Sequence, residues 1–315
     1  MRILALSGIL LFIYFFIKDG PVNIWERIKD LSFINFLILF GLRLVYWSVR
    51  SFNWHMILRT SEGSPGFLKA FHARLGSHSV GYLTPTAKIG GEVIRVFLLE
   101  DIDKRKIAAS VIIDKMCEYL ASIVIVGSGV VTSILILDLN MGFKCMLLGL
   151  TFFLIGILIF FFRKQKEGFL MWFRKKIRIG DKYFSDKEID IKKTDEYISG
   201  FYKYHKKVFY LVSSIYFLNY LLWIFEIFLT LLFLGSLSIS LFKSFIIATL
   251  GSFAFIFPLL PGSLGIFEVT YLGLFKLLGI ATTIGISYII IRRILGLLLA
   301  GIGLVPVFKS GFKKQ

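Results

Sequence analysis

Cysteine, histidine and acidic side chains are scarce in this chain. Of its 315 residues, two are cysteine, four are histidine and 20 are acidic. Two cysteines define no disulfide framework, and the histidines show no metal-binding spacing such as H-E-x-x-H. No glycine-rich phosphate-binding loop is present, so the chain carries no ATPase motif of its own. These absences predict a protein without a metal site or a cofactor.

Charge of either sign is also too sparse for a soluble domain. Charged residues make up 18% of the chain and hydrophobic residues 57%, whereas soluble domains carry about 25% charged and about 45–50% apolar residues. A water-soluble core could not hide this much apolar surface, so lipid must solvate most of the chain. We therefore expect one membrane domain over residues 1–315.

The charge that is present is strongly biased, with a net value of +17. In a soluble protein this excess would suggest nucleic-acid binding, but here the basic residues lie in loops between apolar runs rather than on one folded face. That distribution is the one described by the positive-inside rule. The expected partners are membrane lipids, anionic ones included, and not nucleic acid. A homo-oligomer stays open.

The apolar runs predict an all-α polytopic integral membrane protein with about six full transmembrane helices. The first run follows Arg2 as in a signal peptide, but no small-x-small cleavage site follows it, so we expect an uncleaved span. Residues 18–30 are expected to be a linker. The predicted spans are 3–17, 31–49, 107–137, 143–162, 208–234 and 282–307.

Two further apolar segments, 67–99 and 242–279, are too interrupted by glycine and proline to be ordinary spans. Breaks at membrane depth are tolerated only where protein or a water-filled cavity satisfies the freed backbone groups. Both segments are therefore predicted to be re-entrant helical hairpins.

The loop 163–207 sets the orientation, because it carries fourteen basic and seven acidic residues. Together with the basic stretch from Arg50 to Arg74 and the C-terminal lysines, it is expected on the cytoplasmic side of a cell (inner) membrane. Both termini are then cytoplasmic. On this path the first hairpin enters from the cytoplasm and the second from outside, which is the pattern of an inverted repeat.

The two hairpins carry matching motifs. In each, a proline stands seven residues before a glutamate with glycine between them: Pro85 and Glu92, then Pro261 and Glu268. Proline and glycine stop a helix and leave N–H groups at the start of the next one, where the dipole favours an anion. Ordinary proline kinks with a chance spacing are the alternative. The candidate residues are Thr84, Pro85, Lys88, Gly90, Gly91, Glu92, Pro261, Gly262, Gly265 and Glu268.

Charged residues inside apolar segments form the second group of candidates. Each costs at least about 2.5–3.5 kcal/mol at a helix centre, so it persists where it is paired or faces a cavity. The cations are assigned to a lipid phosphate, and the carboxylates balance them or bind an amino head group. Structural ion pairs are the alternative, and for Arg43 and for Glu226 pairing or snorkelling is favoured over substrate contact. The candidates are Glu92, Arg95, Asp114, Lys115, Glu118, Glu268, Arg292 and Arg293.

Four stretches in order carry a family resemblance: TPTAKIGGEVIR, ASVIIDKMCEYL, PLLPGSLGIFE and IIIRRILG. The chain resembles the lysylphosphatidylglycerol synthase transmembrane-domain family, a flippase-like membrane unit, over nearly its whole length. The resemblance implies movement of lipid between leaflets, with Lys115 where the family usually has arginine. Lysine leaves bidentate phosphate binding at that position in doubt. No soluble synthase domain follows residue 307, so we expect a stand-alone member.

The predicted function is that of a lipid flippase or scramblase rather than an enzyme. Its head-group site would lie at mid-membrane depth between the two hairpins. A membrane-embedded glycosyl- or group-transferase is the main alternative, because Asp101 and Asp103 form a D-x-D motif. A non-catalytic membrane assembly subunit is another.

Overall fold

The computed structural model describes residues 17, 20–84, 89–99, 102–168, 170–172, 188–255 and 263–312. Every regular element in these ranges is a helix, and five of the helices are long and apolar enough to cross a membrane. An all-α polytopic membrane protein is thereby confirmed. The predicted span 3–17 lies outside the described residues. The five spans are Phe33–Leu58, Lys104–Ile136, Met141–Gln165, Lys206–Phe233 and Thr282–Phe308.

Side-chain caps mark the starts of α6 (Lys104–Ile136) and α7 (Met141–Lys166). The side chain of Asp103 accepts the Arg105 N–H at the start of one helix, and Asn140 accepts the Phe143 N–H at the start of the next. Such caps satisfy N–H groups that have no partner inside the helix. The four C-terminal spans correspond to α6 (Lys104–Ile136), α7 (Met141–Lys166), α11 (Lys206–Phe233) and α14 (Thr282–Phe312).

Two predicted boundaries near the N-terminus are wrong. Helix α3 (Phe33–Leu58) continues nine residues beyond the predicted end at Val49, because Arg50 is paired with Glu118 and need not lie in a loop. The predicted linker 18–30 contains helix α2 (Pro21–Lys29), which has proline at its first position. Proline is well tolerated there because that N–H has no helical partner.

The predicted hairpin 67–99 consists of α4 (Phe67–Leu83) and α5 (Ile89–Leu98), which pack on each other. They run antiparallel, since Gly91 lies against Ser77 and Gly81, whereas Leu98 reaches back to Gly76. A Cβ atom on Gly91 would stand 2.3 Å from the Ser77 carbonyl oxygen. Glycine at this position is therefore explained by contact between the two helices rather than by approach to a ligand.

The predicted hairpin 242–279 contains α12 (Leu241–Gly251), a 3₁₀ turn η2 (Ser252–Phe255) and α13 (Ile266–Leu277). Pro261 and Gly262 lie outside the described residues, as do Pro85 and Lys88 in the first hairpin. Gly265 has a φ of 83°, and its N–H donates to the Glu268 carboxylate at 2.7 Å. The start of α13 is thus fixed by a glycine in a left-handed conformation and by the glutamate of the predicted motif.

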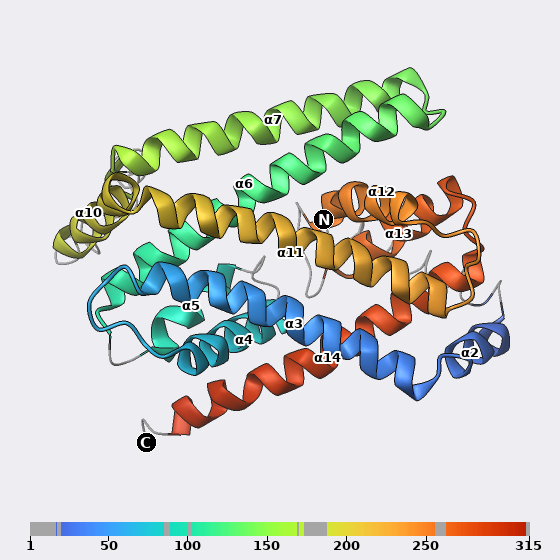
Figure 1. Ribbon diagram of the computed structural model, residues 1–315, viewed down its shortest axis with the longest axis horizontal. Coiled ribbons are helices and arrows are strands. Elements are labelled where there is room, and N and C mark those ends of the chain that lie inside the picture. The colour runs from blue at the N-terminus through green and yellow to red at the C-terminus, as the bar shows by residue number, and fades with distance from the viewer. Residues whose placement is uncertain are drawn as a thin grey trace.

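Figure 1 shows the two broken elements in opposite halves of the molecule along its longest axis, with α4 and α5 towards one end and α12 and α13 towards the other. Each also packs against a long helix that follows the other broken element in the sequence. Helix α4 packs against α14, and α12 packs against α6. Both contacts use a glycine, because Gly303 lies on Leu75 and Ser79, and Gly129 lies on Thr249. The two halves are interlocked rather than side by side.

In the described part of the basic loop 163–207, helix α10 (Glu188–Tyr204) packs against α6 and α7 at one end of the molecule (Figure 1). Its Ile198, Phe201 and Tyr202 are buried. Asp195 accepts the N–H groups of Leu170 and Met171. This part of the predicted loop is therefore anchored to the membrane helices.

The contact between α4 and α14 provides a direct test of the packing. A Cβ atom at Gly303 would stand 2.2 Å from the Ser79 hydroxyl and 2.5 Å from the Leu75 carbonyl oxygen. We expect Gly303→Ala to lower the free energy of unfolding by about 1–3 kcal/mol, as overpacking does. Gly301→Ala on the same helix is the matched control, because nothing lies within 4 Å of its Cβ position. Equal thermal unfolding of both variants in detergent would contradict this packing.

Candidate functional site

The candidate site is a set of charged side chains buried between apolar helices. The largest group, the Asp114 cluster, joins α3, α4, α5, α6 and α11. A charge in an apolar interior persists only when opposite charge and hydrogen bonds compensate its lost hydration. The cluster consists of Arg50, Arg74, Glu92, Arg95, Asp114, Lys115, Glu118 and Tyr216.

Asp114 lies at the centre of this cluster, and its side chain is fully buried. One carboxylate oxygen, Oδ2, accepts from Arg74 at 2.5 Å and from Arg95 at 2.8 Å. The other, Oδ1, accepts from the Tyr216 hydroxyl at 2.5 Å. Tyr216 in turn accepts from Arg74 at 3.0 Å. Two arginines and a tyrosine therefore fix this carboxylate and connect α4, α5, α6 and α11 through it.

The accessible edge of the cluster is formed by Glu92 and Lys115, whose side chains are 23% and 22% exposed. Their Oε1 and Nζ atoms are 2.7 Å apart. Glu92 also pairs with Arg95 at 2.5 Å, as their three-residue spacing predicted. Lys115 also contacts Glu118, which holds Arg50 at 2.5 Å. A ligand approaching the cluster would meet this edge before the fully buried Asp114.

The Asp114 cluster carries more positive than negative charge. Four cations, Arg50, Arg74, Arg95 and Lys115, face the three carboxylates of Glu92, Asp114 and Glu118. Among the described residues, the buried Nε atoms of Arg50 and Arg74 have no hydrogen-bond partner. Since a guanidinium only donates, the cluster favours an anionic acceptor.

Aromatic rings hold two of the arginines in place. The Arg50 guanidinium lies over Tyr46, Trp47 and Tyr216 at 5.2–5.6 Å. The Arg95 guanidinium lies 5.0 Å from the Trp54 ring, and Trp54 donates to Ser110. Cation–π contacts of desolvated arginines are worth about 2 kcal/mol. These contacts orient both guanidinium groups and leave their N–H groups available as hydrogen-bond donors.

A second ionic group, the Glu226 triad, joins α3, α11 and α14. Arg43 and Arg292 both donate to Oε1 of Glu226, at 2.5 Å and 2.9 Å. Pairing was one of the two outcomes expected for Arg43 and Glu226, and the structure shows them paired with each other and with Arg292. Next to Arg292 in sequence, Arg293 donates to Glu268 at 2.5 Å and to the Tyr82 hydroxyl at 3.4 Å.

Aromatic side chains lead from Arg50 of the Asp114 cluster to Arg293, which follows Arg292 of the Glu226 triad in sequence. Trp47 of α3 lies 4.0 Å from the His78 ring of α4, and His78 lies 5.8 Å from Tyr82. Along α3, Arg43 and Arg50 share one face and are seven residues apart, which is roughly 10 Å of helix. We call the Asp114 cluster, these three rings and the Glu226 triad the polar column. It joins two charged levels inside an apolar helix bundle.

The structure therefore divides the predicted site into two parts. Glu92, Arg95, Asp114, Lys115 and Glu118 come together as expected, whereas Arg292 joins Glu226 and Arg293 joins Glu268. Thr84 ends α4 and donates to the Val80 carbonyl.

Arg50 and Arg74 are the main residues that the sequence analysis missed, since it counted them as loop charges. In the structure Arg50 is 7% exposed and Arg74 is 1% exposed. A signal was present for each. Arg50 falls on the same face as Arg43, and Arg74 stands among the small residues Ala70, Ala73 and Gly76, which mark a packed helix face.

The D-x-D motif of the transferase alternative has a structural use. Asp101 lies outside the described residues. Asp103 caps α6 and makes a two-pronged contact with Arg105 at 2.8 Å from each of its oxygens. Hydrogen bonding to Arg105 lowers the pKa of the Asp103 carboxyl. The carboxylate is thus engaged with its own helix.

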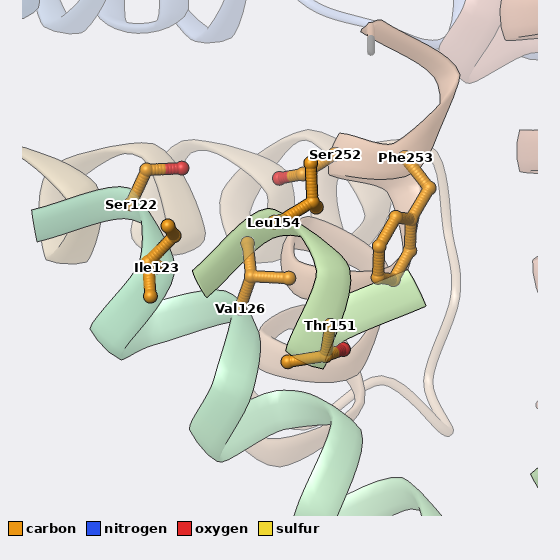
Figure 2. A pocket seen from close by; sticks show the side chains of 7 residues that line it. All are labelled: Ser122, Ile123, Val126, Thr151, Leu154, Ser252 and Phe253. Atoms are coloured by element: carbon orange, nitrogen blue, oxygen red, sulfur yellow. The ribbon is translucent and has the colours of Figure 1, made fainter. Parts of the chain in front are cut away.

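A separate cavity of about 70 Å³ lies between α6, α7 and η2, and Figure 2 shows the side chains that line it. The hydroxyls of Thr151 and Ser252 donate to carbonyl groups of their own turns. This space suits a few waters, each taking about 30 Å³, and is too small for a phospholipid head group. The cavity is lined by Ser122, Ile123, Val126, Thr151, Leu154, Ser252 and Phe253.

The Asp114 cluster predicts a large effect of a small change. Asp114→Asn leaves Arg74 and Arg95 buried without their carboxylate, and breaking a buried pair in this way costs about 3–5 kcal/mol. We expect a marked fall in thermal unfolding temperature in detergent. Asp138→Asn, at an exposed position between α6 and α7, is the control. Equal stability of both variants would show that Asp114 is not required to compensate its arginines.

Comparison with known proteins agrees with the geometry. The family described as the lysylphosphatidylglycerol synthase TM region matches residues 2–303. No curated protein and no solved structure shows a significant match. The match covers four of the long helices, α14 as far as Gly303, both broken elements and both ionic groups. The chain therefore belongs to the lysylphosphatidylglycerol synthase transmembrane-region family, whose members are membrane proteins with a lipid-related function.

Proposed function

We propose that this protein moves a phospholipid or a lipid-linked precursor between the leaflets of the cell membrane. The head group passes along the polar column while the acyl chains stay in the surrounding lipid. The observation that carries the proposal is the column itself, because two charged levels about 10 Å apart cover a substantial part of a hydrocarbon core about 30 Å thick.

The balance of charge supports a phosphate-bearing substrate. The Asp114 cluster has four cations and three carboxylates, and the Glu226 triad has two cations and one carboxylate. Each level thus lacks one negative charge. A phosphodiester supplies that charge and several acceptor oxygens for arginine donors. Glu92, at the accessible edge, is placed to meet an amino group on the same head group.

Internal repetition supports an alternating mechanism. Glu268 follows Glu92 by 176 residues, and Arg293 follows Lys115 by 178. Both pairs form the same contact, at 2.7 Å for Glu92 with Lys115 and at 2.5 Å for Glu268 with Arg293. Each glutamate lies in the first turn of the second helix of its broken element. We propose that the two elements are re-entrant, are related as an inverted repeat and expose the column to one leaflet at a time.

The proposed orientation follows from the basic loops. The loop 163–207 and both termini lie on the cytoplasmic side, where the inner leaflet carries anionic lipids. The Asp114 cluster is then nearer the cytoplasm, ten residues into α6, or roughly 15 Å of helix. Arg292 lies ten residues into α14 from the opposite side. The protein acts as a transporter rather than as a transferase.

Reconstituted liposomes test the proposal. We expect the purified protein to accelerate movement of a fluorescent phospholipid between leaflets, measured by reduction of the label in the outer leaflet. Glu92→Gln should lower the initial rate about tenfold, equivalent to about 1.4 kcal/mol. The reason is that Arg95 and Lys115 lose a shared carboxylate at the edge where the head group enters.

Glu62→Gln is the control, because Glu62 is exposed and lies outside the polar column. Thermal unfolding of each variant shows whether a loss of rate reflects a loss of fold. A folded Glu92→Gln variant that moves lipid as fast as the parent would refute the site. Incorporation of a labelled sugar into lipid by the purified protein would refute the transporter proposal in favour of a transferase.

A further inference from the structure

Two buried tyrosine hydroxyls near the Glu226 triad have no hydrogen-bond partner. Tyr271 of α13 and Tyr288 of α14 are both 0% exposed, and their OH atoms are unsatisfied among the described residues. Both phenols lie within electrostatic range of Arg43, Glu226 and Arg292. A buried hydroxyl without a partner destabilises a fold, and two such groups beside one ionic triad call for a functional explanation.

Packing holds both rings so that neither hydroxyl is free to turn towards another partner. The two rings stack at 5.8 Å with an interplanar angle of 14°. Phe267 lies 4.2 Å from Tyr271, and Phe275 lies 5.3 Å from Tyr288. Gly251 leaves the room that Tyr271 needs, since a Cβ atom there would stand 2.9 Å from its hydroxyl. The positions of the two hydroxyls are therefore determined by the fold.

A further unsatisfied atom near the triad is also a donor. The Nε atom of Arg43 is buried and has no partner among the described residues. Arg43 and Arg292 share a single carboxylate oxygen of Glu226, so one of their two positive charges is uncompensated. Arginine has no acceptor atom, and a tyrosine hydroxyl readily donates. The group that completes this arrangement must therefore be an acceptor with negative charge.

The two guanidinium groups of the triad are partly exposed. The side chains of Arg43 and Arg292 are 11% and 12% exposed, whereas Glu226 is 3% exposed. Tyr288 precedes Arg292 by four residues, so both side chains lie on one face of α14. On the same helices, Leu39, Ile291 and Leu295 form a buried apolar cluster next to the triad. A ligand would bind through the guanidinium groups, with apolar packing beside it.

We propose that Arg43, Arg292, Tyr271 and Tyr288 form a second anion-binding station that takes a phosphate group. It is distinct from the Asp114 cluster and lies roughly 10 Å further along α3. The inference deepens the proposed function, and it rests on that function only in naming a phospholipid as the source of the phosphate. A head group leaving the Asp114 cluster would then find hydrogen-bond donors at this second station before it reaches the opposite leaflet.

The test uses Tyr271→Phe combined with Tyr288→Phe, which removes two hydroxyls and keeps the rings. The lipid-depleted double variant should unfold at or above the parental temperature, because it loses two unpaired buried groups. Its affinity for dihexanoyl phosphatidylglycerol, measured from the ligand-induced rise in unfolding temperature, should fall about tenfold. Tyr202→Phe is the matched control, because the buried Tyr202 hydroxyl already donates to Gln165 at 2.7 Å. That control should lower the unfolding temperature and keep the parental affinity.

Two further ligands identify what is recognised. Dihexanoylglycerol lacks the phosphate and should not stabilise the parent through the two hydroxyls. Inorganic phosphate lacks the acyl chains, and hydroxyl-dependent stabilisation by it alone would support the station with free anion as its source. The station is overturned if the double variant is destabilised without ligand, because its hydroxyls are then structural. It is also overturned if the variant binds the phospholipid as tightly as the parent does.

The liposome assay separates this inference from the proposed function. Hydroxyl-dependent phosphate binding in a protein that moves no lipid would support the station and refute the transport proposal. Transport at the parental rate with parental binding in the double variant would refute the station alone.

Discussion

The structure depends on one constraint: a carboxylate at the centre of an apolar helix bundle must have its charge compensated. Asp114 meets it with two arginines and a tyrosine drawn from three other helices. Because those partners come from separate parts of the chain, satisfying one charge also fixes how α4, α5, α6 and α11 lie against each other. An ordinary apolar contact would permit sliding, whereas this network defines a register.

The two halves of the molecule distribute most of their buried charges differently. In the first half α6 supplies the acids Asp114 and Glu118, and α3, α4 and α5 supply the arginines. In the second half α14 supplies Arg292 and Arg293, and α11 and α13 supply the glutamates. The Asp114 cluster and the Glu226 triad both carry a small excess of positive charge. Under the proposed function, a passing phosphate would meet this excess of positive charge at each level.

Much of the architecture and part of the site were predictable from the sequence. The long apolar runs determine where spans lie, because no other element satisfies its backbone in lipid. Glu92 with Arg95, and Lys115 with Glu118, were recognisable because helical spacing brings neighbours three or four residues apart together. Arg50 and Arg74 were missed for a physical reason. A basic residue near the end of an apolar run resembles a loop charge until its acidic partner on another helix is known.

The sequence by itself determined the membrane class, the two broken elements and the residue types of the ionic groups, since these follow from composition, helix-breaking residues and local spacing. Only the tertiary structure decided which charges meet. Arg74 and Asp114 are 40 residues apart in the sequence, and Arg43 and Glu226 are 183 residues apart, and each pair joins two different helices. Such contacts depend on how whole helices cross, and local sequence carries no information on that crossing. The division into two levels, and the unpaired tyrosine hydroxyls at one of them, became visible only there.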